Sequence, residues 1–251
     1  MIFDLTGRVV LVTGAGQGVG AGIAQTLAGQ GAAVAVNDVV EERAEATAAA
    51  IRDSGGQAVA VAFDVTVLGS VEDGVATTAK ELGPVDVLVN NAGNAGANTF
   101  SPRPFVETDP GEWAKFVDVN LYGVLHCTRA VLSGMCERQW GRVITISSGA
   151  GVVGLRMGIS LYGAGKGGAI SFMRHISQEV ARQGVTANSV ALGLMSNTEG
   201  SSVTASLARQ VPVGRLGTPQ DVGAACVWLA STEASWMTGQ TINLNGGSTT
   251  T

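Results

Sequence analysis

The chain has 251 residues, of which 45% are hydrophobic and 14% are charged, and its formal net charge is −5. This composition excludes a disordered chain, and the negative charge argues against a protein that binds nucleic acid through a basic surface. No apolar run approaches the roughly 18 residues of a membrane-spanning helix, and the amino terminus lacks the pattern of a secretion signal. We therefore expect a cytoplasmic protein of one domain, residues 1–251, that binds neither membrane nor nucleic acid.

The cysteines and histidines predict no metal site. Cys127, Cys136 and Cys226 lack the paired spacing of zinc ligands, and we expect reduced, mostly buried thiols. His126 and His175 fall inside predicted helices, far from any other histidine or cysteine at ligand spacing. Packing or surface roles are the simplest interpretation of all these side chains.

Short β-branched runs alternate with longer helical stretches along the chain. Strands are predicted at residues 8–13, 33–37, 58–63, 85–90, 142–147, 185–190 and 241–244. Helices are predicted up to residue 30 after the first strand, and at residues 41–54, 68–82, 111–139, 161–183 and 219–230. Continuous apolar strands that alternate with helices are typical of a doubly wound α/β fold. We therefore expect a parallel sheet of about seven strands with helices on both faces.

A glycine-rich loop separates the first predicted strand from its helix. Residues 13–20 read TGAGQGVG, and Gly14, Gly18 and Gly20 allow the backbone to turn sharply and approach a pyrophosphate. The amino terminus of the following helix supplies free N–H groups and a partial positive charge. The spacing differs from the strict G-x-G-x-x-G fingerprint, and a glycine turn without a ligand is the alternative. The position between strand and helix favours a dinucleotide site.

Asp38 follows the second predicted strand, where dinucleotide-binding folds hold the adenosine ribose. A carboxylate at this position accepts hydrogen bonds from the ribose hydroxyls and repels a 2′-phosphate. Gln17 in the loop and Val39 after the strand offer no positive charge to such a phosphate. The sequence therefore favours NAD over NADP.

Tyr162 and Lys166 lie four residues apart at the start of the helix predicted over residues 161–183. Residues at this spacing share a helix face, so the ammonium group is expected close to the phenol. A free tyrosine has a pKa of about 10, and a fixed cation nearby favours the phenolate. The Y-x3-K spacing is common by chance, so its meaning depends on the groups around it.

Further polar residues meet at the carboxyl edge of the predicted sheet. Ser147 and Ser148 end the fifth strand, and residues 90–93, NNAG, follow the fourth. Doubly wound folds bind their ligands at this edge. Asn120 lies inside a long predicted helix, where asparagine competes with the backbone, and we expect it to distort the helix and hold a water.

Together these segments resemble the short-chain dehydrogenase/reductase family, and the resemblance covers essentially the whole chain. The matching segments are TGAGQGVG (13–20), DV (64–65), NNAG (90–93), Asn120, Ser148, YGAGK (162–166) and MTGQTINLNGG (237–247). The resemblance implies a Rossmann-type fold, an NAD(P)-dependent oxidoreductase activity and a homotetramer. It assigns the cofactor to about residues 1–150, and catalysis and substrate to about residues 151–251.

The resemblance also implies a role for each of four catalytic residues. Tyr162 is expected to be the general acid/base at the substrate oxygen, which Ser148 orients. Lys166 is expected to lower the tyrosine pKa and to bind the nicotinamide ribose, while Asn120 positions a water for proton relay. Expected cofactor contacts are Gly14, Gln17, Gly18, Val19, Gly20, Asp38, Asp64, Val65, Asn91, Gly93, Tyr162, Lys166 and Met195, with Asp64 at the adenine amino group.

The chain departs from the family pattern in two places. Leu192-Gly193 stands where the family usually carries Pro-Gly, so we expect a looser turn in the backbone near the nicotinamide carboxamide. Thirteen residues separate Ser148 from Tyr162, one more than in many relatives, which leaves Ser147 as an alternative catalytic serine.

The substrate side is expected to be apolar. The loop before Tyr162 carries Val152, Val153, Leu155, Met157 and Ile159, and residues 194–216 read as a mobile lid. Arg103 and Arg156 are candidates for an anionic group of the substrate, or for contact with solvent.

We predict an oxidoreductase that transfers a hydride between NAD(H) and a secondary alcohol or ketone. A 3-oxoacyl-carrier-protein reductase or a 3-hydroxyacyl dehydrogenase is the alternative, and a non-catalytic dinucleotide-binding protein is a remote one. A hydrolase is disfavoured because no G-x-S-x-G elbow surrounds Ser148.

Overall fold

A computed structural model describes residues 2–93, 102–196 and 202–250. Seven parallel strands form one sheet in the order β3-β2-β1-β4-β5-β6-β7. They are β1 (Val9–Val12), β2 (Ala33–Val36), β3 (Gln57–Ala60), β4 (Val87–Asn90), β5 (Gly141–Ser148), β6 (Val185–Leu192) and β7 (Thr241–Leu244). The predicted doubly wound parallel sheet is confirmed.

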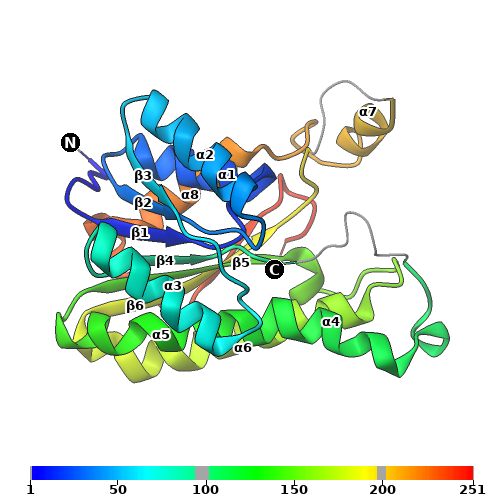
Figure 1. The fold of residues 1–251 in the computed structure, drawn as a ribbon. Coiled ribbons are helices and arrows are strands. Elements are labelled where there is room, and N and C mark those ends of the chain that lie inside the picture. The colour runs from blue at the N-terminus through cyan, green and yellow to red at the C-terminus, as the bar shows by residue number, and fades with distance from the viewer. Residues whose placement is uncertain (1, 94–101, 197–201, 251) are drawn as a thin grey trace.

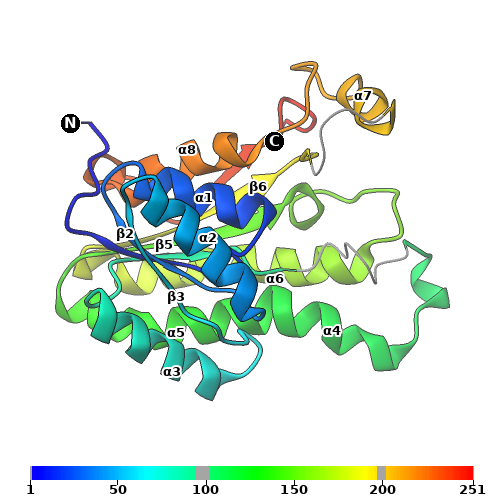
Figure 2. The same cartoon turned by 45° about the horizontal axis from the view of Figure 1, so that its top comes forward.

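Helices cover both faces of the sheet (Figures 1 and 2). One face is covered by α1 (Gly18–Ala28), α2 (Glu41–Asp53) and α8 (Pro219–Ala230). The other is covered by α3 (Leu68–Glu81), α5 (Gly123–Glu137) and α6 (Ser160–Val180), with the short α4 (Trp113–Val117) beyond α5. The short α7 (Ser202–Ala208) stands apart from these layers at one end of the molecule.

Strand β1 is apolar along its length because it contributes to two cores. In β1, Val10 and Val12 pack into the core under α1 and α8, whereas Leu11 packs into the core under α3 and α5. All four residues of β1 are buried. Side chains alternate between the faces of a strand, so burial on both faces requires the continuous apolar runs seen in the sequence.

The strand order reverses between β1 and β4, which follow each other in the sheet but not in the sequence. At such a switch point the connections leave toward opposite sides and open a crevice at the carboxyl ends of the strands. Thr13 follows β1 and Asn91 follows β4 at this crevice, and β5, which ends at Ser148, lies beside β4. The fold therefore brings the sequence motifs of both halves to one edge.

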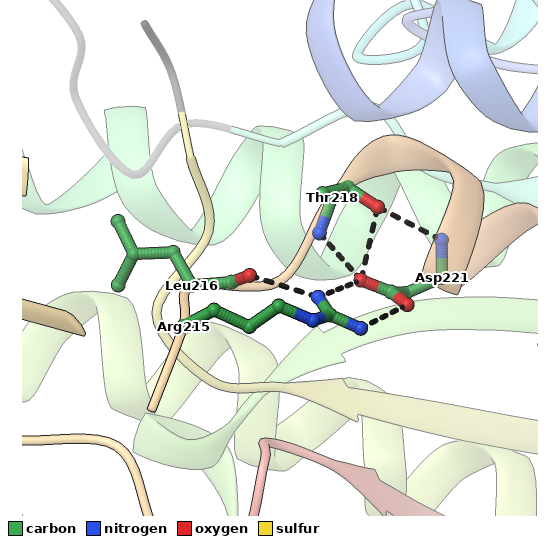
Figure 3. A network of polar contacts seen from close by, with 4 residues as sticks. All are labelled: Arg215, Leu216, Thr218 and Asp221. Atoms are coloured by element: carbon green, nitrogen blue, oxygen red, sulfur yellow. Dashed lines mark hydrogen bonds and ion pairs between the residues drawn. The ribbon is translucent and has the colours of Figure 1, made fainter. Parts of the chain in front are cut away.

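Helix α8 begins with a capping box that Figure 3 shows. The Thr218 hydroxyl accepts a hydrogen bond from the Asp221 backbone N–H, and the Asp221 carboxylate accepts one from the Thr218 N–H. Arg215 pairs with the same carboxylate through two hydrogen bonds of 2.6 and 2.8 Å, which holds the pKa of Asp221 well below its ordinary value. The helix start then packs on α1, where a Cβ added to Gly22 would lie 2.2 Å from the Pro219 Cβ.

The described residues lack two features, a membrane-spanning helix and a cluster of metal ligands. No helix in residues 2–93, 102–196 and 202–250 is long and apolar enough to cross a membrane. Within the same residues, no group of three or more histidine, cysteine, aspartate or glutamate side chains is arranged to hold a metal ion.

Candidate functional site

The glycine loop between β1 and α1 needs glycine at specific points. Gly14 has a φ of 60°, and a Cβ added to it would lie 2.8 Å from the Ala92 Cα. A Cβ on Gly20 would lie 2.3 Å from the Gly14 carbonyl oxygen. Side chains at these positions would push the loop away from the end of β4 and from the start of α1.

The amino terminus of α1 faces the loop without a side-chain cap. Gln17 precedes the helix in an extended conformation, and its side chain makes no capping hydrogen bond. The N–H groups of the first turn, at Gly18, Val19 and Gly20, have no partners within the helix because of their position. This turn therefore has the donor geometry that binds an anion such as a pyrophosphate.

Asp38 lies beside the loop at the end of β2. Its side chain is buried, with Oδ2 accepting a hydrogen bond of 3.2 Å from the Gly16 N–H and Oδ1 one of 3.0 Å from the Val40 N–H. Arg43 on the first turn of α2 also contacts the loop, since a Cβ on Gly16 would lie 2.6 Å from the Arg43 Cβ. The sequence analysis did not single out this arginine.

Asp64 and Val65 follow β3 on the same edge of the sheet. The Asp64 Oδ1 accepts hydrogen bonds of 2.8 Å from both the N–H and the hydroxyl of Thr66, which closes a tight turn. The buried Val65 contacts Gly123 of α5, and its carbonyl oxygen lies 3.0 Å from the His126 Nδ1. This histidine therefore has a defined partner next to the expected adenine site.

Asn91 fastens the glycine loop from the β4 side. Its Nδ2 donates hydrogen bonds of 2.9 Å to the carbonyls of Thr13 and Gly14. The Thr13 hydroxyl oxygen in turn accepts from the backbone N–H groups of Asn91 and Ala92, at 3.1 and 3.0 Å. Asn91 of the motif NNAG thus forms hydrogen bonds to the glycine loop itself. The spacing of the motifs in the sequence does not indicate this contact.

Asn120 lies in a turn of π-helix, Asp118–Tyr122, that separates α4 from α5. Its buried side chain donates a hydrogen bond of 3.0 Å from Nδ2 to the carbonyl of Phe116, four residues earlier. The helix predicted over residues 111–139 is therefore interrupted where the asparagine was expected to distort it. Single π turns of this kind are frequent at functional sites.

Gly93 brings the asparagine and the lysine together. A Cβ added to Gly93 would lie 2.9 Å from both the Asn120 Oδ1 and the Lys166 Nζ. The two polar atoms therefore border the same small space at the end of β4. Only a residue without a side chain leaves this space open.

The Ser148 side chain lies against the phenol of Tyr162, where it acts to lower the pKa of the tyrosine. The Ser148 Oγ also accepts a hydrogen bond of 3.2 Å from the Ala150 N–H, whereas Ser147 is buried and donates to the carbonyl of Lys166. Of the two serines considered from the sequence, Ser148 is the one against the tyrosine. Ser148 caps the short 3₁₀ turn Gly149–Gly151 that follows β5, which fixes the orientation of its side chain.

Lys166 lies one helical turn after Tyr162 and is buried. Its Nζ donates a hydrogen bond of 2.9 Å to the carbonyl of Ile146, and burial lowers its pKa to about 8. Burial raises the pKa of Tyr162, and the Ser148 side chain lowers it to a smaller extent. The lowered tyrosine pKa expected from the sequence rests on the lysine together with a bound nicotinamide, and burial, which penalises both charged forms, works against it.

A cleft of about 460 Å³ opens next to the serine–tyrosine pair. Among the described residues it is lined by Phe105 and by residues 150–155, 158–160 and 163. Four of the five expected apolar residues line it, while Met157 is exposed outside it. Of the arginines considered from the sequence, Arg103 pairs with Glu112 and Arg156 is exposed.

The segment after β6 begins inside the sheet. Leu192 continues the sheet, with Ser148 of β5 and Leu244 of β7 as its neighbours, and the Gly193 N–H donates to the Leu244 carbonyl at 3.0 Å. Leucine, unlike proline, allows the strand to run on to this residue, so the turn that was expected to be looser starts only after it.

Met195 forms an isolated parallel bridge with Gly217 just before α8. The Ser196 N–H donates to the Gly217 carbonyl, and the Gly217 N–H to the Leu194 carbonyl, at 2.8 and 3.0 Å. The Met195 side chain packs against the core under α1 and α8. Residues 197–201 of the expected lid lie outside the described residues.

Comparisons with known proteins agree over nearly the whole chain. The family model described as enoyl-(acyl carrier protein) reductase matches residues 14–249. The 3-oxoacyl-[acyl-carrier-protein] reductase of Vibrio cholerae is 38% identical over 97% of this chain and 98% of its own length. The short-chain reductase protein NovJ of Streptomyces niveus is 37% identical over 95% of this chain and 93% of its own length.

Two solved structures show the same fold. A putative gluconate dehydrogenase from Agrobacterium tumefaciens superposes with a TM-score of 0.91 at 30% identity, over 99% of this chain and 98% of the other. A gluconate 5-dehydrogenase from Burkholderia cenocepacia, in complex with NADP and tartrate, gives 0.89 at 32% identity, over 98% and 96%. With the curated relatives, these matches establish that the chain belongs to the short-chain dehydrogenase/reductase family of oxidoreductases.

Proposed function

We propose that the protein transfers a hydride between NAD(H) and a secondary alcohol or ketone, with Asn120, Ser148, Tyr162 and Lys166 as its catalytic residues. The observation that carries this proposal is the pairing of the Tyr162 and Ser148 side chains beside the crevice at the strand-order switch. Family membership supports an oxidoreductase, and these four side chains supply the donors and acceptors that the reaction needs.

The tyrosine and the serine act on the substrate oxygen in this proposal. In ketone reduction, the Tyr162 hydroxyl donates a proton to the oxygen as negative charge develops on it, and Ser148 holds that oxygen by a hydrogen bond. In the reverse direction the tyrosine removes the proton of the alcohol. Bound NADH would supply the hydride for the reduction, and bound NAD would accept it in the reverse direction and carry a positive charge on its nicotinamide ring.

Lys166 and Asn120 support the proton transfer by the tyrosine in this proposal. The Lys166 ammonium, one helical turn along α6, favours negative charge on the tyrosine oxygen and donates to the nicotinamide ribose. Asn120 borders the same space at Gly93 and holds the water through which the proton passes to solvent. Because burial raises the tyrosine pKa and lowers the lysine pKa, we expect the proton distribution in this pair to depend on the charge of the bound cofactor.

The cofactor fits the crevice by its chemistry. The free N–H groups of Gly18, Val19 and Gly20 suit the pyrophosphate, and the Asp38 carboxylate suits the adenosine ribose. At Asp64 the two contacts of the tight turn both go to Oδ1, and we place the adenine amino group at Oδ2. Met195 contributes a backbone contact, because its side chain packs in the core.

We propose NAD as the preferred cofactor. The Asp38 carboxylate beside the glycine loop would repel a 2′-phosphate, and the exposed acids Glu41 and Glu42 add negative charge at the start of α2. Arg43 is the one cation on this helix turn. The Burkholderia cenocepacia neighbour was solved with NADP, which makes the cofactor preference a point to measure in this chain.

Asp38→Ala tests that preference. Loss of the carboxylate removes the ribose contact and the repulsion of a 2′-phosphate, so the ratio of kcat/KM for NAD over NADP should fall about tenfold or more. Steady-state kinetics with both cofactors measure the ratio. Glu72→Ala, which removes an exposed carboxylate on α3, is the control for net charge, and an unchanged ratio in Asp38→Ala would count against the ribose contact.

Reduction of 3-oxoacyl groups is the second candidate for the activity. The similarity to the Vibrio cholerae reductase favours it, and the apolar side chains that line the cleft suit an acyl chain. Among the described residues of the lining, only Ser160 offers a side-chain hydrogen-bond partner to a polyhydroxy acid. A 3-oxoacyl thioester and a neutral aliphatic ketone should therefore oxidise NADH faster than the keto product of gluconate does, and the opposite order would contradict the proposed substrate class.

A further inference from the structure

Asn37 is a buried polar residue directly after β2, where it joins parts of the chain that are distant in the sequence. Only 1% of it is exposed. Its side-chain Oδ1 accepts a hydrogen bond of 3.3 Å from the Gly14 N–H in the glycine loop. Its Nδ2 donates hydrogen bonds of 3.1 and 3.0 Å to the carbonyls of Val61 and Phe63, which follow β3.

The backbone of Asn37 is tied to the same loop. Its N–H donates to the Val12 carbonyl at 3.0 Å, and its carbonyl accepts from the Ala15 N–H at 2.6 Å. The residue therefore bonds to the chain before, within and after the turn at Gly14. A buried amide is stable only when its donors and acceptors are satisfied, and here each side-chain polar atom has a partner.

The two segments that the side chain joins are two walls of the proposed cofactor site. Gly14 belongs to the loop that faces the pyrophosphate, and Phe63 is followed by Asp64 and Val65 at the expected adenine position. No other described side chain has hydrogen bonds to both segments. A shift of one wall relative to the other would therefore be opposed mainly at Asn37.

We infer that Asn37 is a positioning residue, which sets the spacing between the glycine loop and the segment after β3 and thereby preorganises the cofactor site. This inference rests on the proposed function, because it assigns the crevice to a dinucleotide. Preorganisation raises affinity by reducing the ordering that binding requires. Asn37 touches no reacting atom, so its loss should weaken cofactor binding far more than it slows the reaction at saturation.

Asn188 provides a matched control. It is also an asparagine in the sheet, 1% exposed, and its side chain also bridges backbone groups. Its Nδ2 donates to the Met237 carbonyl at 2.8 Å, and its Oδ1 accepts from the Gln240 N–H at 3.0 Å. These bonds hold the entry to β7 rather than the glycine loop, so a purely structural loss can be measured there.

The experiment measures NADH binding by fluorescence titration, together with urea unfolding and steady-state kinetics, for wild type, Asn37→Ala and Asn188→Ala. We expect both variants to lose stability. Asn37→Ala should raise the Kd and KM for NADH about tenfold or more and change kcat less than about threefold. Asn188→Ala should leave the Kd within about twofold.

Asn37→Ser retains a short hydrogen-bonding side chain and serves as a second variant in case Asn37→Ala does not fold. It should raise the Kd for NADH by an intermediate factor, because one hydroxyl replaces only part of the amide's bonds. Wild-type affinity in folded Asn37→Ala, or in Asn37→Ser where the alanine variant does not fold, would overturn the positioning role while leaving the proposed function intact. A wild-type protein that binds neither NADH nor NADPH would instead contradict the proposed function and this inference with it.

Discussion

The Lys166 ammonium lies in the protein interior, where its neighbour is the carbonyl of Ile146 at 2.9 Å. Burial lowers its pKa from 10.5 to about 8, because the interior solvates a charge less well than water does. The lysine is therefore costly to keep charged at neutral pH. Such a cost is typical of residues retained for function rather than for stability.

The lowered pKa of Lys166 predicts that the free energy of unfolding depends on pH. Between about pH 8 and 10.5 the amine is protonated in the unfolded chain but not in the folded protein, so the unfolded state binds more protons and folding stability rises with pH. Between pH 7 and pH 10, wild type should gain up to about 3 kcal/mol of unfolding free energy relative to Lys166→Met. Urea unfolding of both proteins at the two pH values measures this gain, and a difference that does not change with pH would refute it.

At the scale of elements, most helices and strands begin and end within a few residues of their predicted bounds. The strand at Thr241–Leu244 and the helix at Pro219–Ala230 agree to the residue, because alternating polar and apolar residues and a proline at a helix start are strong local signals. The π turn around Asn120 interrupts a helix whose apolar pattern is continuous in the sequence. The asparagine was therefore the only signal that indicated an interruption. The short α7 was not predicted, since its Ser- and Thr-rich sequence carries no helical periodicity.

The capping box at Thr218 gives a test at the same scale. Thr218→Ala should lower the unfolding free energy by about 1 kcal/mol, because the Asp221 N–H loses its side-chain acceptor at the start of α8. Thr218→Ser keeps the hydroxyl and should retain most of the stability. Urea unfolding compares them, and equal losses in the two variants would show that the methyl group, rather than the cap, matters.

At the scale of the whole molecule, alternating strands and helices were enough to predict the sheet and the edge at which the motifs meet. The sequence motifs also indicated the chemistry of Ser148, Tyr162 and Lys166. What could not be predicted are contacts between distant segments: the bonds from Asn37 to two walls of the crevice, and the lysine's bond to Ile146. Burial of Tyr162, which works against the expected lowering of its pKa, also could not be predicted because it depends on the complete fold.

Kinetics and NADH binding of Tyr162→Phe test the central claim, that this phenol carries the proton of the reaction. Removal of the hydroxyl should lower kcat about a thousandfold while the Kd for NADH stays within about threefold. Tyr122→Phe, which changes the other tyrosine of the chain, should leave both values near those of wild type. Turnover by Tyr162→Phe within about tenfold of wild type would contradict the account.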